Sequence, residues 1–209
     1  MEHVDRQQHW ERIYNTKALT EVSWYQPVPE TSLAFIQQQQ IPLQARIIDI
    51  GGGDSFLADH LLELGYQDIT VLDISETAIN RAKERLGNKA ERITWIVSDI
   101  TQFVPTAPYD FWHDRAAFHF LTEEREVNRY KEVLQQGLQP GGMGLIGTFS
   151  EQGPQKCSGI SIKQYTAQSL KEVLAPFFEP VTCFTVDHPT PFDTVQNFVF
   201  CGFKPRLAT

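Results

Sequence analysis

Short apolar runs alternate with amphipathic patterns along most of the chain. Residues 47–50 form a run that stops at three glycines, and further runs occupy residues 69–72, 93–97, 109–114 and 145–149. Between the runs, apolar side chains recur every three or four residues, as on a helix that packs against a sheet. Strands that are apolar at nearly every position are typical of a parallel sheet covered on both faces.

The two ends of the chain depart from this alternation. Near the N-terminus, Trp10, Ile13 and Tyr14 have helical spacing, so we expect residues 1–40 to form a helical lid or cap segment. Near the C-terminus, two strands separated by a proline-rich loop at residues 189–191 predict a hairpin.

The pattern as a whole predicts an α/β protein. We expect a Rossmann-like sheet of seven mostly parallel strands with a C-terminal antiparallel hairpin, and helices on both faces. The predicted organisation is a single domain over residues 1–209, in which residues 41–209 form the cofactor-binding core.

Several residues predict where elements begin. Ser75 and Thr122 are suited to cap helices, because their hydroxyls accept hydrogen bonds from free backbone N–H groups. A helix is also expected to begin near Ser55, and a Pro-Gly-Gly turn at residues 140–142 to precede the fifth strand.

The composition of the chain argues against two classes of partner, nucleic acids and membranes. The chain has 18 Lys and Arg against 26 Asp and Glu, a net charge of −8, which argues against a nucleic-acid partner. The polar first eight residues contain no signal sequence, and no apolar run is long enough to cross a membrane. We therefore expect a cytoplasmic protein with no membrane partner.

The three cysteines are odd in number and widely spaced. Cys157, Cys183 and Cys201 form no Cys-x-x-Cys pair, so we expect neither a disulfide framework nor a zinc site, and no other metal site. We expect Cys157 to be an idle, buried thiol. His188, before the proline-rich loop, has no assigned role.

Acidic residues end three consecutive predicted strands. Asp49, Asp73 and Asp99 should meet at one edge of the sheet, beside glycines 51–53. A carboxylate there accepts both hydroxyls of a ribose or the amine of a base, which predicts a nucleoside ligand. The dinucleotide pattern G-x-G-x-x-G fails because its third glycine falls at Phe56, which disfavours a nicotinamide-dependent dehydrogenase.

These segments together resemble a known family. The acidic-x-Gly-x-Gly segment at residues 49–54, Asp73, the segment 98–100, the strand-four segment 109–114 and the Pro-Gly-Gly turn at 138–142 are similar to the motifs of class I S-adenosylmethionine-dependent methyltransferases. The similarity extends over nearly the whole chain.

The resemblance implies that S-adenosyl-L-methionine is the cofactor. Asp49 should lie near its ammonium group, Asp73 at its ribose, and Asp99 at its adenine; aromatic side chains suit a cationic sulfonium. The expected cofactor-binding residues are Trp24, Tyr25, Asp49, Gly51, Gly52, Gly53, Asp73, Ile74, Ser98, Asp99, Ile100 and His113.

The segment after the fourth strand carries the candidates for contact with the methyl acceptor. His113 and His119 are expected as possible bases, Asp114 as a group that orients an amine or the cofactor, and Arg115 as a group that holds an anionic acceptor. These four residues are the candidate catalytic set.

The predicted function is methyl transfer to a small-molecule nucleophile, with sulfur, oxygen and nitrogen all open. The segment 114–117 resembles thiopurine-type small-molecule methyltransferases. The segment 9–14 and residues 23–25 resemble both those enzymes and lysine methyltransferases that act on translation factors, so a protein lysine N-methyltransferase is the alternative. A third alternative, from another class, is a non-catalytic module that binds S-adenosylmethionine. The oligomeric state is left open.

Overall fold

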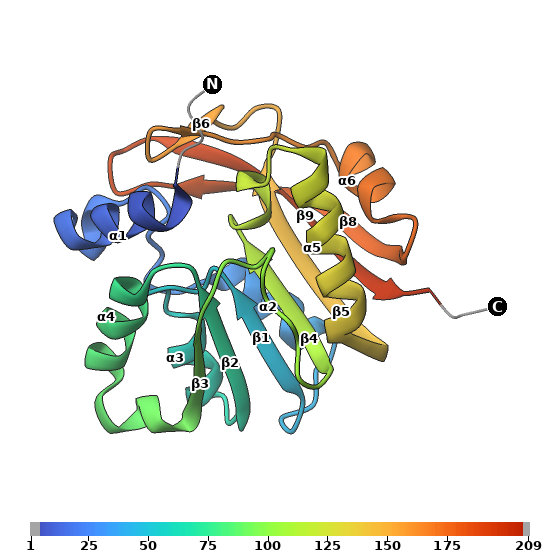
Figure 1. Cartoon of the computed structure of the whole chain (residues 1–209), viewed down its shortest axis with the longest axis horizontal. Helices are drawn as coiled ribbons and strands as arrows, with labels where there is room; N and C mark the ends of the chain where they lie inside the picture. The colour runs from blue at the N-terminus through green and yellow to red at the C-terminus, as the bar shows by residue number, and fades with distance from the viewer. Residues whose placement is uncertain (1–4, 207–209) are drawn as a thin grey trace.

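Seven strands form one sheet in the order β3-β2-β1-β4-β5-β9-β8 (Figure 1). The computed structural model describes residues 5–206. The five strands from β3 to β5 are parallel, whereas β9 runs antiparallel to both β5 and β8, which confirms the predicted fold. The strands are β1 Arg46–Ile50, β2 Asp68–Asp73, β3 Ile93–Val97, β4 Tyr109–Arg115, β5 Leu138–Phe149, β8 Phe178–Pro189 and β9 Val195–Pro205.

Helices cover both faces of this sheet, with α5 in front and α2 and α3 behind in Figure 1. Side chains alternate along each strand, so Trp112 packs in the core formed with α5 and α6, whereas Phe111 packs in the core formed with α2 and α3. The helices are α1 Arg6–Thr16, α2 Glu30–Gln38, α3 Leu57–Glu63, α4 Glu76–Leu86, α5 Glu124–Gly137 and α6 Ala167–Leu174.

Of the two predicted helix caps, one is confirmed and one was wrong. Ser75 caps α4, since its hydroxyl accepts from the backbone N–H of Ala78 at 3.2 Å, as predicted. The prediction that Thr122 caps α5 was wrong: the helix begins at Glu124, and the carboxylate of Glu126 accepts instead from the N–H of Glu123.

The prediction that a Pro-Gly-Gly turn precedes the fifth strand was also wrong. Residues 140–142 lie inside β5, which already starts at Leu138 and shifts its register against β4. A small hairpin of β6 (Lys156–Cys157) and β7 (Ile160–Ser161) was not predicted, because its strands are too short to show a periodic pattern.

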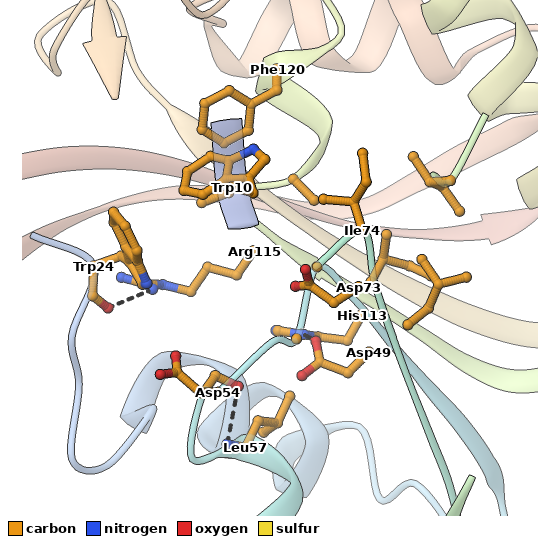
Figure 2. Close-up of a pocket in the computed structure, with 18 of the residues that line it drawn as sticks. Trp10, Trp24, Asp49, Asp54, Leu57, Asp73, Ile74, His113, Arg115 and Phe120 are labelled. Atoms are coloured by element: carbon orange, nitrogen blue, oxygen red, sulfur yellow. Dashed lines mark hydrogen bonds and ion pairs between the residues drawn. The ribbon is translucent and has the colours of Figure 1, made fainter. Parts of the chain in front are cut away.

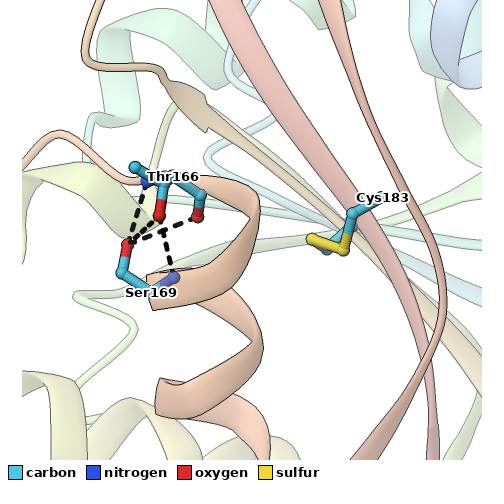
Figure 3. Close-up of a disulfide and its surroundings, with 4 residues drawn as sticks. Thr166, Ser169 and Cys183 are labelled. Carbon is cyan, nitrogen blue, oxygen red and sulfur yellow. Dashed lines mark hydrogen bonds between the residues drawn. A yellow bond between two sulfur atoms is a disulfide. The ribbon is translucent and has the colours of Figure 1, made fainter.

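The closing hairpin carries a disulfide, so the expectation of unpaired cysteines was wrong for two of the three. Cys183 on β8 lies directly opposite Cys201 on β9, and the two are bonded (Figure 3). Their separation of 18 residues in the sequence does not disclose this register. Cys157 is a free, buried thiol, as predicted.

The N-terminal segment, described here from residue 5, docks against α4. The carboxylate of Glu11 accepts from the backbone N–H groups of Glu76 and Thr77 at 2.6 and 3.3 Å, at the start of that helix. The guanidinium of Arg81 donates to the carbonyl of Tyr14 at 2.9 Å. Helix α1 is therefore held at the edge of the sheet where the strands end. None of the helices in residues 5–206 is long and apolar enough to span a membrane.

Candidate functional site

A cavity opens where the carboxyl ends of β1 and β4 lie side by side (Figure 2). The chain crosses from β1 to β2 on one side and returns to β4 on the other, and such a switch in strand order leaves a crevice for a ligand. Loops from both strands and residues of α1 surround the cavity.

The glycines after β1 let the backbone approach its neighbours closely. Gly51 has φ +65°, and a Cβ there would lie 2.7 Å from the Cβ of Ala117 in the loop after β4. A Cβ on Gly52 would lie 2.6 Å from Oδ2 of Asp49. Any larger residue at these positions would displace the loop or the carboxylate, so the turn requires glycine.

The helix that follows this turn begins later than predicted. Helix α3 starts at Leu57, and the hydroxyl of Ser55 only accepts weakly from its N–H, at 3.4 Å. The three glycines and the next two residues form the turn itself, which delays the first helical residue. With seven residues, α3 is also shorter than a typical helix.

A buried chain of hydrogen bonds joins β1, β4 and α2. Nδ1 of His113 lies 2.6 Å from Oδ1 of Asp49, and Nε2 lies 2.8 Å from the hydroxyl of Ser32. An ionised carboxylate only accepts, so Nδ1 carries the hydrogen, and in the neutral ring Nε2 accepts from Ser32. Both ring nitrogens of His113 are therefore engaged within the protein.

Asp73 ends β2 at the cavity. Its Oδ1 accepts from the backbone N–H of Ser75 at 2.8 Å. Burial, together with the charges of Asp54, Asp49 and Glu11, raises the pKa of Asp73 to about 7, although the bond from Ser75 opposes the shift. A ligand that donates hydrogen bonds to Asp73 would favour its ionised form.

Asp99 follows β3 and is held by two partners. Thr101 donates to Oδ1 through its backbone N–H and its hydroxyl, and the guanidinium of Arg6 lies 3.0 Å from Oδ2. Burial pushes the pKa of Asp99 upward, but the bonds from Thr101 and the charge of Arg6 outweigh it and leave the pKa below its usual value. Arg6 also pairs with Glu126 at 2.9 Å, so α1 is tied across this end of the cavity.

An aromatic cluster forms the opposite wall. The ring of Trp10 lies 5.6 Å from that of Trp24 and 5.0 Å from that of Phe120, in edge-to-face geometry, and Tyr14 completes the group. All four side chains line the cavity (Trp10, Trp24 and Phe120 are labelled in Figure 2). Trp10 was predicted only as part of a helical face, but it is the ring on which the cluster is centred.

Two of the candidate catalytic residues do not line the cavity. Asp114 is fully buried, and it accepts from the N–H groups of Ala117 and Phe118 and from the hydroxyl of Tyr130. Burial raises its pKa to about 6. His119 accepts from the N–H of Phe149, and burial with the nearby charge of Arg115 lowers its pKa to about 3.

The other two, His113 and Arg115, line the cavity. So does Cys157, whose thiol pKa burial raises to about 12, so the thiol is protonated at neutral pH. His188 lies away from the lining, and its Nε2 donates to the carbonyl of Ser23 at 2.8 Å. It thereby ties the closing hairpin to the N-terminal segment.

The structure thus gathers most of the predicted residues around one cavity. The predicted residues that line it are Trp24, Tyr25, Asp49, Gly51, Gly52, Asp73, Ile74, Ser98, Asp99, Ile100, His113 and Arg115. Gly53, Asp114 and His119 do not line it. The lining residues that were not predicted include Arg6, Trp10, Tyr14, Ser32, Phe120 and Phe149; no local pattern in the sequence marks these six as neighbours of a ligand.

A family model and curated relatives match this chain. Residues 47–142 match a model described as a methyltransferase domain. The chain is 28% identical over 216 residues to the eEF1A lysine and N-terminal methyltransferase of Mus musculus, which covers 92% of this chain and 30% of the relative. The chain therefore spans less than a third of that relative's length. Nodulation protein S of Rhizobium tropici is 28% identical over 108 residues, which cover 52% of this chain and 45% of that protein.

Solved structures share the fold over nearly the whole chain. An S-adenosylmethionine-dependent methyltransferase from Anabaena variabilis superposes with a TM-score of 0.75 and 18% identity, covering 98% of this chain and 96% of that one. The N-methyltransferase NodS from Bradyrhizobium japonicum, in complex with S-adenosylhomocysteine, superposes with a TM-score of 0.69 and 18% identity, covering 98% and 100%.

Proposed function

We propose that this chain, a member of the class I S-adenosylmethionine-dependent methyltransferase family, transfers a methyl group to a small-molecule nucleophile. The observation that carries the proposal is that the acidic strand ends and the aromatic cluster line the same cavity. One side suits a nucleoside with a cationic centre, and the other suits an apolar acceptor.

The cofactor side fits S-adenosylmethionine in shape and in chemistry. Gly51 and Gly52 let the backbone pass close to Ala117 and Asp49 along the cavity wall, where we propose that the methionine part lies. Asp73 keeps Oδ2 without a hydrogen-bond donor among residues 5–206, so it is available to ribose hydroxyls. Ile74 and Ile100 offer apolar contact to the adenine. When bound, the cofactor supplies an electrophilic methyl group on a sulfonium sulfur.

His113 is proposed as a positioning residue. Because both its nitrogens are engaged, it holds Asp49 in one orientation toward the cofactor's ammonium group. Asp114 is proposed to shape the loop after β4 through its backbone bonds. The chemical step then relies mainly on orienting the two reactants and excluding water, both of which serve an in-line methyl transfer.

Calorimetry with S-adenosylhomocysteine tests the cofactor step. We expect saturable binding at a 1:1 ratio in the micromolar range or tighter. Incubation with S-[methyl-³H]adenosylmethionine and a cell extract then tests the acceptor class: label that the enzyme transfers to a small molecule other than the cofactor supports the proposal. If S-adenosylhomocysteine does not bind at high micromolar concentrations, the proposed function is wrong.

Protein lysine methylation is the second candidate, favoured by one specific observation. The relative that covers 92% of this chain is an eEF1A lysine and N-terminal methyltransferase. The net charge of −8 also suits a basic protein substrate. In the same labelling experiment, a labelled protein band that disappears when the enzyme is omitted supports this second candidate, and enzyme-dependent label in a small molecule other than the cofactor supports the first.

A further inference from the structure

Arg115 presents a fixed guanidinium to the acceptor side of the cavity. It is the last residue of β4, and Nη1 donates to the carbonyl of Trp24 at 3.3 Å, as the dashed line in Figure 2 shows. Its guanidinium carbon lies 4.7 Å from the centre of the Phe198 ring. A strand end, a carbonyl and an aromatic face thus hold this group in place.

The charge of Arg115 has no carboxylate partner among residues 5–206. The other arginine of the described residues that lines the cavity, Arg6, is paired with Asp99 and Glu126 at 3.0 and 2.9 Å. Nη2 of Arg115 is shielded from water and has no hydrogen-bond partner in the described part of the chain. A charge that is shielded from water and keeps an N–H donor without a hydrogen bond lowers the stability of the protein, unless a bound ligand supplies the missing acceptor.

The groups around Arg115 do not supply an anion. Burial, with the charge of Arg115, lowers the pKa of His119 to about 3 and that of His188 to about 4, so both rings are neutral at pH 7. The thiol of Cys157 is protonated. The charge of Asp49 raises the pKa of Arg115, but this carboxylate is bound to His113. Burial lowers the pKa of Arg115 only to about 10, so it remains charged.

Apart from the acidic strand ends, much of the cavity is lined by apolar side chains. Trp10, Trp24, Phe120 and Phe149 line it, and Leu121 adds an aliphatic contact. A ligand that fits this environment has an apolar body and one anionic group. A planar carboxylate matches the fork of a guanidinium, and a single arginine offers few donors for a doubly charged phosphate.

We propose that Arg115 binds the carboxylate of the methyl acceptor while the aromatic side chains contact its apolar body, so that the acceptor is a small carboxylic acid. The proposal rests on the proposed function, because it names the acceptor class of that reaction. In this proposal, Arg115 determines the specificity for the methyl acceptor. Recognition of the cofactor remains with the strand ends of β1, β2 and β3.

Calorimetry on the complex with S-adenosylhomocysteine tests this assignment. The probes are phenylacetate, 4-hydroxyphenylacetate and 3-mercaptopropionate, each compared with its uncharged amide. We expect at least one acid to bind tenfold or more tightly than its amide. Arg115→Gln should abolish this preference, whereas Arg115→Lys should keep part of it, because the charge remains and the fork is lost. The matched control is Arg125→Gln, an exposed arginine outside the cavity.

The outcomes separate the two proposals. If S-adenosylhomocysteine does not bind the wild type, the proposed function fails. If it binds but no acid is preferred over its amide, the function stands and the role of Arg115 is overturned. If Arg115→Gln weakens S-adenosylhomocysteine itself tenfold and leaves the preference for acids unchanged, Arg115 binds the methionine carboxylate of the cofactor, which also overturns the assignment. Circular dichroism of each variant verifies that it is folded.

Discussion

Asp49 and His113 are bonded at 2.6 Å across the neighbouring parallel strands β1 and β4, where both are almost completely buried. The two residues are 64 positions apart in the sequence but face each other in the strand register. The bond joins the strand that carries the glycine turn to the strand that carries Arg115. It therefore couples the two sides of the cavity that we propose for the cofactor and for the acceptor.

Removing this partner should destabilise the protein. His113→Ala leaves the buried carboxylate of Asp49 without its donor, and we expect the free energy of unfolding to fall by about 1–3 kcal/mol. Urea unfolding at pH 7.5 measures it. Ser32→Ala, which removes only the hydroxyl bonded to the other ring nitrogen, is the matched control and should cost less. Equal losses in the two variants would contradict the role given to Asp49 and His113.

Asp73→Asn should weaken the binding of S-adenosylhomocysteine by about 1–3 kcal/mol, or roughly 5- to 150-fold, because charge-assisted hydrogen bonds to the ribose are lost. Calorimetry measures the change. Asp68→Asn lies on the same strand but at its other end, where Asp68 pairs with Arg46 on the surface, and it should leave affinity unchanged. Unchanged affinity in Asp73→Asn would place the ribose elsewhere.

The raised pKa of Asp73 predicts a dependence of binding on pH. Ribose hydroxyls favour the ionised carboxylate, so binding of S-adenosylhomocysteine should release a proton and weaken as pH falls below about 7. Titrations between pH 5.5 and 8.5 in buffers of different ionisation enthalpy detect this proton. Asp73→Asn should bind more weakly but without this proton release.

The raised pKa of Asp73 also predicts a pH dependence of stability, opposite in direction to that of ligand binding. The native state holds a proton on Asp73 up to about pH 7, whereas the ordinary pKa of the carboxyl, expected in the unfolded chain, is 3.8, so the native state binds more protons between these two pH values. The free energy of unfolding of the ligand-free protein should therefore fall as pH rises through this range. Asp73→Asn should flatten that part of the curve, which thermal unfolding at several pH values records. An unchanged slope would contradict a raised pKa.

Arg6 should control how firmly α1 is docked. Arg6→Gln removes ion pairs to Asp99 and Glu126 that are mostly shielded from water. We expect the rate of amide exchange in α1 to rise about 3- to 5-fold, because the two pairs together stabilise the docked helix by up to about 1 kcal/mol. Hydrogen exchange read by mass spectrometry measures it. Arg125→Gln, which breaks an exposed pair with Glu123, should leave α1 unchanged.

The disulfide between Cys183 and Cys201 gives a direct chemical test. Thiol titration of the protein unfolded without reductant should detect one thiol, that of Cys157, and three after reduction. Replacing both bonded cysteines with serine should lower the free energy of unfolding by about 3 kcal/mol, since the bond closes a loop of this size in the unfolded chain. Three thiols without reductant would show that the bond does not form.

Local patterns in the sequence were sufficient to predict the seven-stranded sheet and the acidic strand ends that line the cavity. Apolar runs identify the strands, and Asp49, Asp73 and Asp99 follow from their positions at strand ends, because parallel strands end at one edge. The glycines after β1 indicate a close backbone approach for the same local reason.

The sequence was less informative where side-chain direction decides the outcome. His113, Asp114, Arg115 and His119 are close in the chain, yet only His113 and Arg115 line the cavity. Alternation along β4 and the turn after it direct the other two into the protein. A cluster in the sequence is therefore not a cluster in space.

The sequence alone determined the class of fold, the acidic strand ends and a nucleoside ligand, because these depend on the period of apolar residues and on residues local to each turn, and the resemblance of its motifs to a family implied the cofactor. Only the tertiary structure decided that Arg6 and Trp10 reach the cavity, that Cys183 meets Cys201, and that Arg115 has no acidic partner in the described chain. These are contacts between distant segments, set by strand register and by the docking of α1, and no short stretch of sequence contains them.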